Sequence, residues 1–306
     1  MIRKLRDNIN KTFVGKEEVV ENVLICLLAG GHVLLEDVPG AGKTTLAKTL
    51  AKSVACTFGR IQFTPDTLPS DVTGLSVYNM KTGEFEYREG VIMHQILLAD
   101  EINRTSPKTQ ASLLEAMAEG QVTVDGRIYP LPTPFIVLAT QNPVEFLGTF
   151  PLPEAQLDRF MMRLTIGYPE EAGELQMAKN YLNGVDTEQV QSVCNAEDIL
   201  AMRKAVEGVH ISDALLGYIR GVIAESRKEK RFVLGASPRA FLHLISTSRA
   251  HAYLDGRDFA KPDDVKAVAA NTLHHRLQLT PEARLQKEDT DQVIRDMMYR
   301  VILPLE

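Results

Sequence analysis

Apolar and polar positions follow two different periods along the chain, and the change falls near residue 168. Before it, short apolar or β-branched runs alternate with stretches of helical spacing, which predicts a parallel sheet covered by helices on both faces. The five candidate strands are Val33–Glu36, Arg60–Phe63, Ile96–Asp100, Phe135–Thr140 and Phe160–Thr165.

One helix of this first region is marked at both ends. Ser106 is a good N-cap, Pro107 suits the first helical position and Gly120 suits the stop. The residues expected to share a face of this helix are Ala111, Leu114 and Ala118.

After residue 169 helical periodicity dominates and candidate strands vanish. The stretch Gly184–Asn195 is polar and irregular, as in a linker. A chain of 306 residues suits two domains, and we expect an α/β domain over residues 1–183 and an all-α domain over residues 184–306. The candidate helices are Glu170–Leu182, Ala196–Val206, Ser212–Lys228, Ser237–Leu254, Pro262–His275 and Asp291–Val301.

The composition indicates a soluble globular protein, with 44% hydrophobic and 24% charged residues. We find no apolar run of membrane-spanning length and no apolar signal segment at the N-terminus, so membrane insertion is not expected. The three cysteines show no metal-binding spacing and are interpreted as reduced thiols, which favours a cytoplasmic location. The net charge of −6 argues against general affinity for nucleic acid, although it leaves room for a local basic groove.

A glycine-rich loop follows the first candidate strand and opens a helix. Gly40 and Gly42 let backbone N–H groups approach phosphate oxygens. Lys43 can reach the β- and γ-phosphates, and the Thr44 hydroxyl can bind Mg²⁺. Asp37 stands where the strict pattern has glycine, and the alternative is an ordinary turn with a surface lysine. The predicted phosphate-binding residues are Pro39, Gly40, Ala41, Gly42, Lys43, Thr44 and Thr45.

Two further candidate strands end in polar side chains, at the edge where α/β sheets bind ligands. Asp100 can hold Mg²⁺ through water, and Glu101 can polarise an attacking water as general base. Asn142 could orient that water or contact the γ-phosphate. The alternatives are a strand that ends in solvated acids and a simple turn at Asn142-Pro143.

Two arginines stand where they could offer positive charge to a phosphate. Arg159 precedes the fifth candidate strand, and Arg239 falls in the first turn of a helix capped by Ser237. A cation at a helix N-terminus is unfavourable by roughly 0.3–1 kcal/mol, which hints at a compensating anion. The alternatives are an ion pair between Arg159 and Asp158, and a solvated Arg239.

Together these residues resemble the MoxR family of AAA+ ATPases, in the clade that includes magnesium chelatase and MCM motors. The resemblance covers almost the whole chain, and its most specific blocks are Phe63–Gly74 and Pro151–Phe160. The other segments that carry it are Phe13–Gly15, Leu35–Thr44, Ala99–Arg104, Thr140–Pro143 and Gly235–Arg239.

The resemblance implies ATP and Mg²⁺ as cofactors and a role for each candidate residue. Val14 and Gly15 would belong to the adenine pocket, where Lys16 replaces the glutamine often found next. The other implied roles are Walker A for Lys43 and Thr44, Walker B for Asp100 and Glu101, sensor 1 for Asn142, arginine finger for Arg159 and sensor 2 for Arg239.

The same resemblance implies a five-stranded sheet, a helical lid and a ring, usually of six subunits. Two insertions are expected to face the pore or axial face of the ring. One is Leu75–Gly90, and the other surrounds Asp125-Gly126, which is also a strong two-residue hairpin signal. The family is similar to chaperones that act with von Willebrand A domain partners, so such a partner and a client protein are implied.

The leading hypothesis is therefore an ATP-driven factor that remodels or matures protein complexes. A nucleic-acid motor like MCM is the alternative, but Asp125, Glu84, Glu86 and Glu89 oppose the cations nearest the two insertion tips, Arg127 and Lys81. A phosphate-tracking loop should be more basic. A nucleotide-gated scaffold without hydrolysis is disfavoured by intact Lys43, Asp100 and Glu101.

Overall fold

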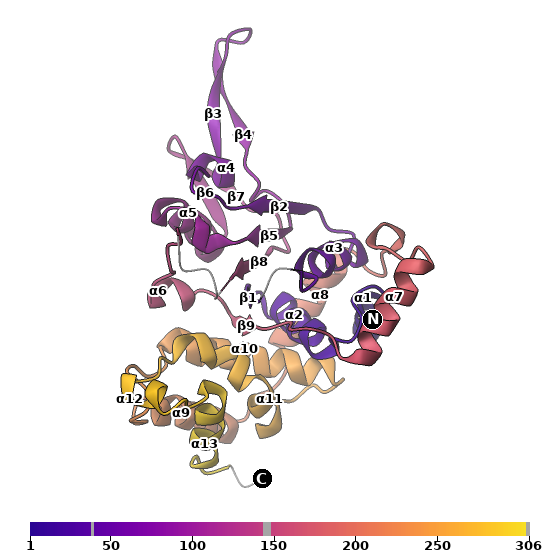
Figure 1. Ribbon diagram of the computed structural model, residues 1–306. Coiled ribbons are helices and arrows are strands. Elements are labelled where there is room, and N and C mark those ends of the chain that lie inside the picture. Colours follow the sequence, from indigo (N-terminus) through magenta and orange to yellow (C-terminus); the bar gives the residue numbers. More distant parts are fainter. Residues whose placement is uncertain (38–39, 143–147, 304–306) are drawn as a thin grey trace. The chain divides into compact units, whose positions relative to one another are not determined.

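The computed structural model describes residues 1–37, 40–142 and 148–303, and the chain forms two compact units (Figure 1). The first unit comprises residues 1–21, 32–152 and 164–200, and the second comprises residues 22–31 and 153–163 and the chain from residue 201 onward. The expected division into residues 1–183 and 184–306 stays a prediction.

A five-stranded parallel sheet with the order β2-β5-β8-β1-β9 confirms the predicted α/β class. Two of its strands have the predicted bounds, and the ends of the others differ by one or two residues. Every residue of β5 is buried, as expected for a strand covered on both faces. The strands are β1 (Val33–Glu36), β2 (Phe58–Gln62), β5 (Ile96–Asp100), β8 (Ile136–Gln141) and β9 (Met162–Leu164).

Two antiparallel hairpins stand outside the sheet, at the positions of the two predicted insertions. The first joins β3 (Gly74–Asn79) to β4 (Glu84–Glu89), and the second joins β6 (Gln121–Val124) to β7 (Arg127–Pro130). The rings of Tyr87 and Tyr129 stack with centroids 4.0 Å apart, so the hairpins contact each other at their bases.

The helix predicted from its capping residues is confirmed as α5 (Pro107–Glu119), with the Ser106 hydroxyl accepting from the Thr109 N–H. Of the three residues expected to share a face, Leu114 is buried, whereas Ala111 and Ala118 are exposed. The buried stripe runs through Gln110, Leu113, Leu114 and Met117. Leucine and methionine bury more apolar area than alanine, and these positions follow the i, i+3, i+4, i+7 spacing.

Six further helices and two 3-10 turns lie in the described part of the chain before residue 190. They are α1 (Ile2–Asn10), α2 (Glu17–Ala29), α3 (Lys43–Ser53), α4 (Pro69–Thr73), α6 (Glu154–Leu157) and α7 (Glu171–Leu182), with 3-10 turns at Ile102–Arg104 and Thr187–Gln189.

The rest of the chain is helical, as predicted, and α9, α10, α11 and α13 pack against one another. The short helix α12 lacks a counterpart among the predicted elements. The bounds are α8 (Ala196–Glu207), α9 (Asp213–Ser226), α10 (Pro238–Leu254), α11 (Pro262–Leu273), α12 (Pro281–Leu285) and α13 (Thr290–Tyr299), with a 3-10 turn at His274–Arg276. Within the described ranges, no helix is both long and apolar enough to span a bilayer.

Candidate active site

The glycine-rich loop leads from β1 into α3. Gly40 and Gly42 have φ angles of +87° and +85°, a region that residues with a Cβ rarely adopt. Gly42 is the N-cap of α3, so the first-turn N–H groups of that helix are available to an anion. Pro39, also predicted to bind phosphate, lies outside the described residues.

Asp37, where the sequence departs from the strict loop pattern, is buried and ties the loop to a distant segment. Its Oδ2 accepts a hydrogen bond from the Gly167 N–H at 2.6 Å. Its backbone carbonyl accepts from Lys43 Nζ at 3.1 Å. The carboxylate therefore positions residue 167, and Lys43 remains at the loop.

The loop and the two acids at the end of β5 line one cavity of about 380 Å³. The glycine-rich loop with the start of α3, the end of β5 and strand β2 all contribute to its walls. The predicted members are Gly40, Gly42, Lys43, Thr44, Thr45, Asp100 and Glu101, and the cavity also includes Arg60 and Gln62. Hard oxygen donors and a lysine thus face the same space, which is the arrangement that a metal-bound phosphate chain requires.

Thr140, which the sequence analysis did not select, connects the two acids. Its hydroxyl donates to Asp100 Oδ1 at 2.7 Å and accepts from the Glu101 N–H at 2.8 Å. Glu101 has a φ of +55°, which is uncommon for a residue with a Cβ. Asn142 is buried directly after the same strand, β8. The end of β8 therefore supports the acids of β5.

Strand β2 contributes two side chains that the sequence analysis placed in a strand without a role. Gln62 Nε2 donates to Glu101 Oε2 at 2.7 Å, and Arg60 Nη2 donates to Asp100 Oδ2 at 2.8 Å. Arg104 adds an ion pair to Glu101 at 3.2 Å. Arg60 and Gln62 occupy alternate positions of the strand and therefore share a face. This pattern was the one signal in the sequence that could have indicated a common role for the two side chains.

A smaller, mainly apolar cavity of about 80 Å³ adjoins the loop, and Val14 and Ala41 line it. Gly15 does not line it. A Cβ at Gly15 would lie 3.3 Å from the Gly173 Cα, so this glycine allows close packing on α7. Its other apolar walls include Phe13, Ile166, Tyr168 and Met177, which no sequence pattern marked as pocket residues.

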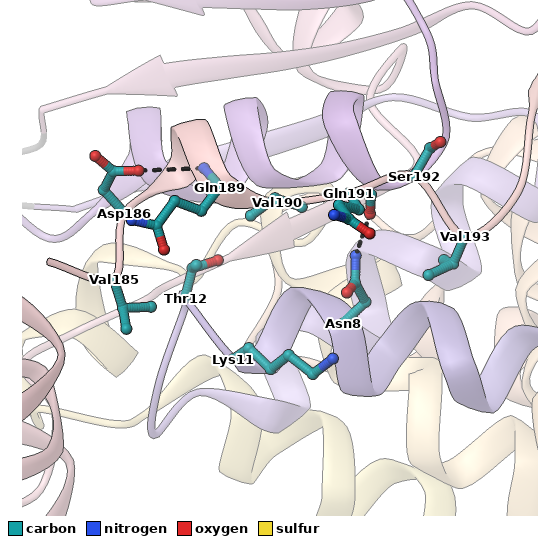
Figure 2. A pocket seen from close by; sticks show the side chains of 10 residues that line it. All are labelled: Asn8, Lys11, Thr12, Val185, Asp186, Gln189, Val190, Gln191, Ser192 and Val193. Atoms are coloured by element: carbon teal, nitrogen blue, oxygen red, sulfur yellow. Dashed lines mark hydrogen bonds between the residues drawn. The ribbon is translucent and has the colours of Figure 1, made fainter. Parts of the chain in front are cut away.

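A cavity of about 360 Å³, lined mostly by polar residues, lies between the end of α1 and residues 185–193 (Figure 2). Asn8 Nδ2 donates to Gln191 O at 3.0 Å and to Ser53 Oγ at 2.9 Å. The predicted linker is therefore held against the α/β unit. Thr12 lines both this cavity and the apolar one.

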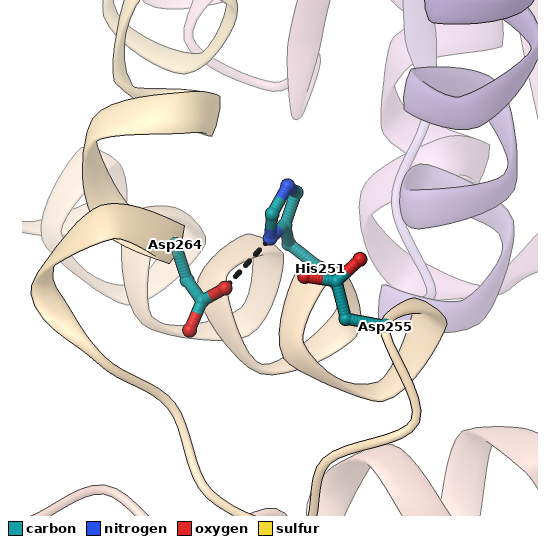
Figure 3. A group of neighbouring side chains, drawn as sticks. All are labelled: His251, Asp255 and Asp264. Atoms are coloured by element: carbon teal, nitrogen blue, oxygen red, sulfur yellow. Dashed lines mark hydrogen bonds and ion pairs between the residues drawn. The ribbon is translucent and has the colours of Figure 1, made fainter.

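A group of side chains in the second unit has metal-like composition: His251, Asp255 and Asp264 (Figure 3). Arg257 already supplies positive charge to this group. Its guanidinium donates to both carboxylate oxygens of the buried Asp264, at 2.7 and 2.5 Å, and to Asp255 at 3.0 Å. His251 Nδ1 lies 2.7 Å from Asp264 Oδ1. We interpret the group as structural.

Asp264→Asn is expected to lower the free energy of unfolding by roughly 3 kcal/mol, because breaking a buried ion pair leaves its partner, here Arg257, without a compensating charge. Burial alone would raise the pKa of Asp264, but hydrogen bonds from Arg257 and His251 hold it well below its usual range. The stabilisation is thus complete above the unfolded carboxyl pKa of about 3.9 and is lost as pH falls further. Urea unfolding at pH 7 and pH 3 measures both effects.

The matched control for Asp264 is Asp263→Asn, whose side chain is 70% exposed. It should change the unfolding free energy by less than about 0.5 kcal/mol. Equal effects of the two substitutions at pH 7 would contradict the structural role of Asp264.

Arg159 and Arg239 belong to the second unit, around Asp158. Asp158 Oδ1 accepts from Arg276 Nε at 2.8 Å, and the Ser237 hydroxyl donates to the same carboxylate at 2.9 Å. Arg239 Nη1 lies 3.6 Å from Asp158 Oδ2. The anion that compensates Arg239 at the start of α10 is thus a carboxylate in this structure, and the roles of both arginines stay predictions.

Known proteins resemble this chain over almost its whole length. The family model for ATPases associated with various cellular activities (AAA) matches residues 32–162, and an AAA lid model matches residues 224–297. The chain is 48% identical to YeaC of Bacillus subtilis, over all of this chain and 96% of YeaC. It is 40% identical to the chaperone MoxR1 of Mycobacterium tuberculosis, over 97% of this chain and 80% of MoxR1. A crystal structure from Cytophaga hutchinsonii superposes with a TM-score of 0.91 at 40% identity, covering 99% of this chain and 94% of that one.

Proposed function

Because this chain belongs to the MoxR family of AAA+ ATPases, we propose that it uses the energy of ATP hydrolysis to remodel or mature other proteins. Binding and hydrolysis of ATP are the shared activity of the family. The chaperone role is supported by the similarity to MoxR1, which is named a chaperone. The client, and a von Willebrand A domain protein as partner, belong to the proposal.

Mg²⁺ and the catalytic roles are part of the same proposal. The Thr44 hydroxyl and the Asp100 carboxylate line one cavity and are the oxygen donors that Mg²⁺ prefers. Bound there, the ion would neutralise charge on the phosphates. Lys43 and the loop N–H groups would hold the phosphates, and Glu101 would accept a proton from the attacking water.

The observation that carries the protein-directed role is the exposed aromatic end of the β3–β4 hairpin, which projects from its unit in Figure 1. Tyr78 and Phe85 face each other in register and form an edge-to-face pair with centroids 5.3 Å apart. They are 53% and 67% exposed, and Met80 at the turn is 91% exposed. Exposed apolar patches mark contacts with proteins, whereas a loop that follows nucleic acid would need unopposed cations.

Client capture tests this role. A tagged Glu101→Gln protein should retain specific proteins with ATP and release them with ADP, and the set should include a von Willebrand A domain protein. Adding Tyr78→Ser and Phe85→Ser should abolish capture, whereas Leu285→Ser, at a residue 84% exposed on α12, should not. Thermal unfolding verifies that each variant is folded. Salt-sensitive binding of single-stranded DNA, lost in the hairpin variant, would favour the motor alternative instead.

We further propose a homo-oligomeric ring, usually of six subunits in this family, in the cytoplasm. The prediction that one subunit completes the site of its neighbour depends on this ring and on Arg159.

A further inference from the structure

The magnesium-binding carboxylate of the proposed site is already occupied by a side chain of the same chain. Asp100 Oδ1 accepts from the Thr140 hydroxyl, and Asp100 Oδ2 accepts from Arg60 Nη2 at 2.8 Å. The Asp100 side chain is 11% exposed, whereas that of Arg60 is 46% exposed. Asp100 is therefore held in place, while Arg60 is the partner with freedom to leave.

The position of Arg60 follows from the sheet. Gln62 pairs with Asp100 in the β2–β5 register, and Arg60 lies two residues earlier, on the same face of β2. Arg60 Nη2 also donates to Gln62 Oε1 at 3.3 Å, and Gln62 in turn donates to Glu101. Arg60 thus belongs to a hydrogen-bonded row that reaches the proposed general base, which acts at the terminal phosphate.

A guanidinium at this point has two electrostatic consequences. It competes with a divalent cation for Asp100, because two positive charges a few ångströms apart repel each other. Once displaced, it still lines the cavity that holds Lys43 and the loop. There it can donate to phosphate oxygens in a planar, two-pronged geometry that lysine lacks.

We propose that Arg60 exchanges partners with the nucleotide state: it neutralises Asp100 while Mg²⁺ is absent and moves to the terminal phosphate of ATP bound in the same subunit when Mg²⁺ takes its place. Arg60 is then a cis sensor of the terminal phosphate. This inference rests on the proposed Mg²⁺ site.

Equilibrium binding of ADP and of a non-hydrolysable ATP analogue, each titrated over buffered free Mg²⁺, tests the exchange. In Arg60→Gln, the Mg²⁺ concentration that gives half-maximal binding should fall about 3- to 10-fold, because no guanidinium then competes with Mg²⁺ for Asp100. The preference for the ATP analogue over ADP should fall about 10-fold, because a charge-assisted contact to the terminal phosphate is lost.

Two further variants separate the charge of Arg60 from its geometry and control for the loss of an arginine elsewhere. Arg60→Lys retains the charge, so its Mg²⁺ requirement should stay near that of the wild type while its preference for the ATP analogue falls partway. Arg127→Gln removes an exposed arginine from the β6–β7 hairpin and should change neither quantity. Thermal unfolding verifies the fold of each protein.

Three other results would contradict the exchange of partners by Arg60 or the Mg²⁺ site on which it rests. An unchanged Mg²⁺ requirement and an unchanged ATP preference in Arg60→Gln would make Arg60 a static partner of Asp100. Equal weakening of both nucleotides would exclude the terminal phosphate as its ligand. Wild-type binding that is indifferent to Mg²⁺ would refute the proposed Mg²⁺ site itself, together with the exchange.

Discussion

Glu101→Gln is expected to retain ATP binding and to lose turnover by about 10²–10⁴-fold, the usual contribution of a general base. Glu101 lines the phosphate cavity and follows a buried strand whose end is supported by Thr140. The amide has the same shape as the carboxylate but cannot accept the proton of the attacking water. Phosphate release at saturating ATP measures the loss, and equilibrium nucleotide binding verifies that the site is intact.

Two comparisons separate this role from a general disturbance of the site. Lys43→Ala should lose nucleotide binding itself, because it removes the lysine of the phosphate loop. Glu89→Gln, which removes a carboxylate from the exposed β4 strand, should leave turnover near the wild-type rate. Hydrolysis by Glu101→Gln at a rate near that of the wild type would exclude Glu101 as the base.

The features that the sequence predicted well are those encoded by local chemistry. The loop needs glycine at residues 40 and 42 because both have positive φ, and the ends of α5 need Ser106 and Gly120. Strand β5 is recognisable because it is buried along its whole length and is therefore apolar without interruption up to Asp100. Such signals are complete within a few residues.

The contacts of Arg60, Gln62 and Thr140 could not be predicted in the same way. Each joins residues about 40 positions apart, through the register of neighbouring strands. A strand pattern gives the face on which a side chain lies, but strand order and register decide which acid it meets. The apolar cavity beside the loop was difficult for the same reason, since Phe13, Ile166 and Met177 come from three separate segments.

Short helices and helix faces show a second limit. Helices α4, α6 and α12 have four or five residues, which is too few to establish a 3.6-residue period. In α5 the bounds were right, but only Leu114 of the expected face is buried, because alanine is compatible with both exposed and buried positions. Leu113 and Met117 decide the buried side through the larger area that they remove from water.

Arg159→Ala is expected to reduce turnover by about 10³–10⁵-fold, the effect of removing an arginine finger that acts in trans, while each subunit still binds ATP. Arg159 follows α6 in the second unit, beside an Asp158 that already accepts hydrogen bonds from Arg276 and Ser237. The alternative, a structural pairing of Arg159 with Asp158, predicts lower stability without a sharp loss of turnover. Arg159→Lys should rescue little, because lysine lacks the two-pronged donor geometry.

Mixing two inactive proteins tests the trans arrangement directly. Arg159→Ala retains an intact phosphate loop, and Lys43→Ala retains an intact finger, so a mixed ring contains interfaces that combine both. Titrating one variant into the other at constant total protein should therefore raise hydrolysis above the sum of the separate rates. Arg163, on the adjoining strand β9, is a second candidate for the finger. Arg163→Ala should gain nothing on mixing with Lys43→Ala if Arg159 is the finger. Mixed rings must be demonstrated by native mass spectrometry, and hydrolysis that never exceeds the sum in such rings would exclude Arg159 as a trans finger.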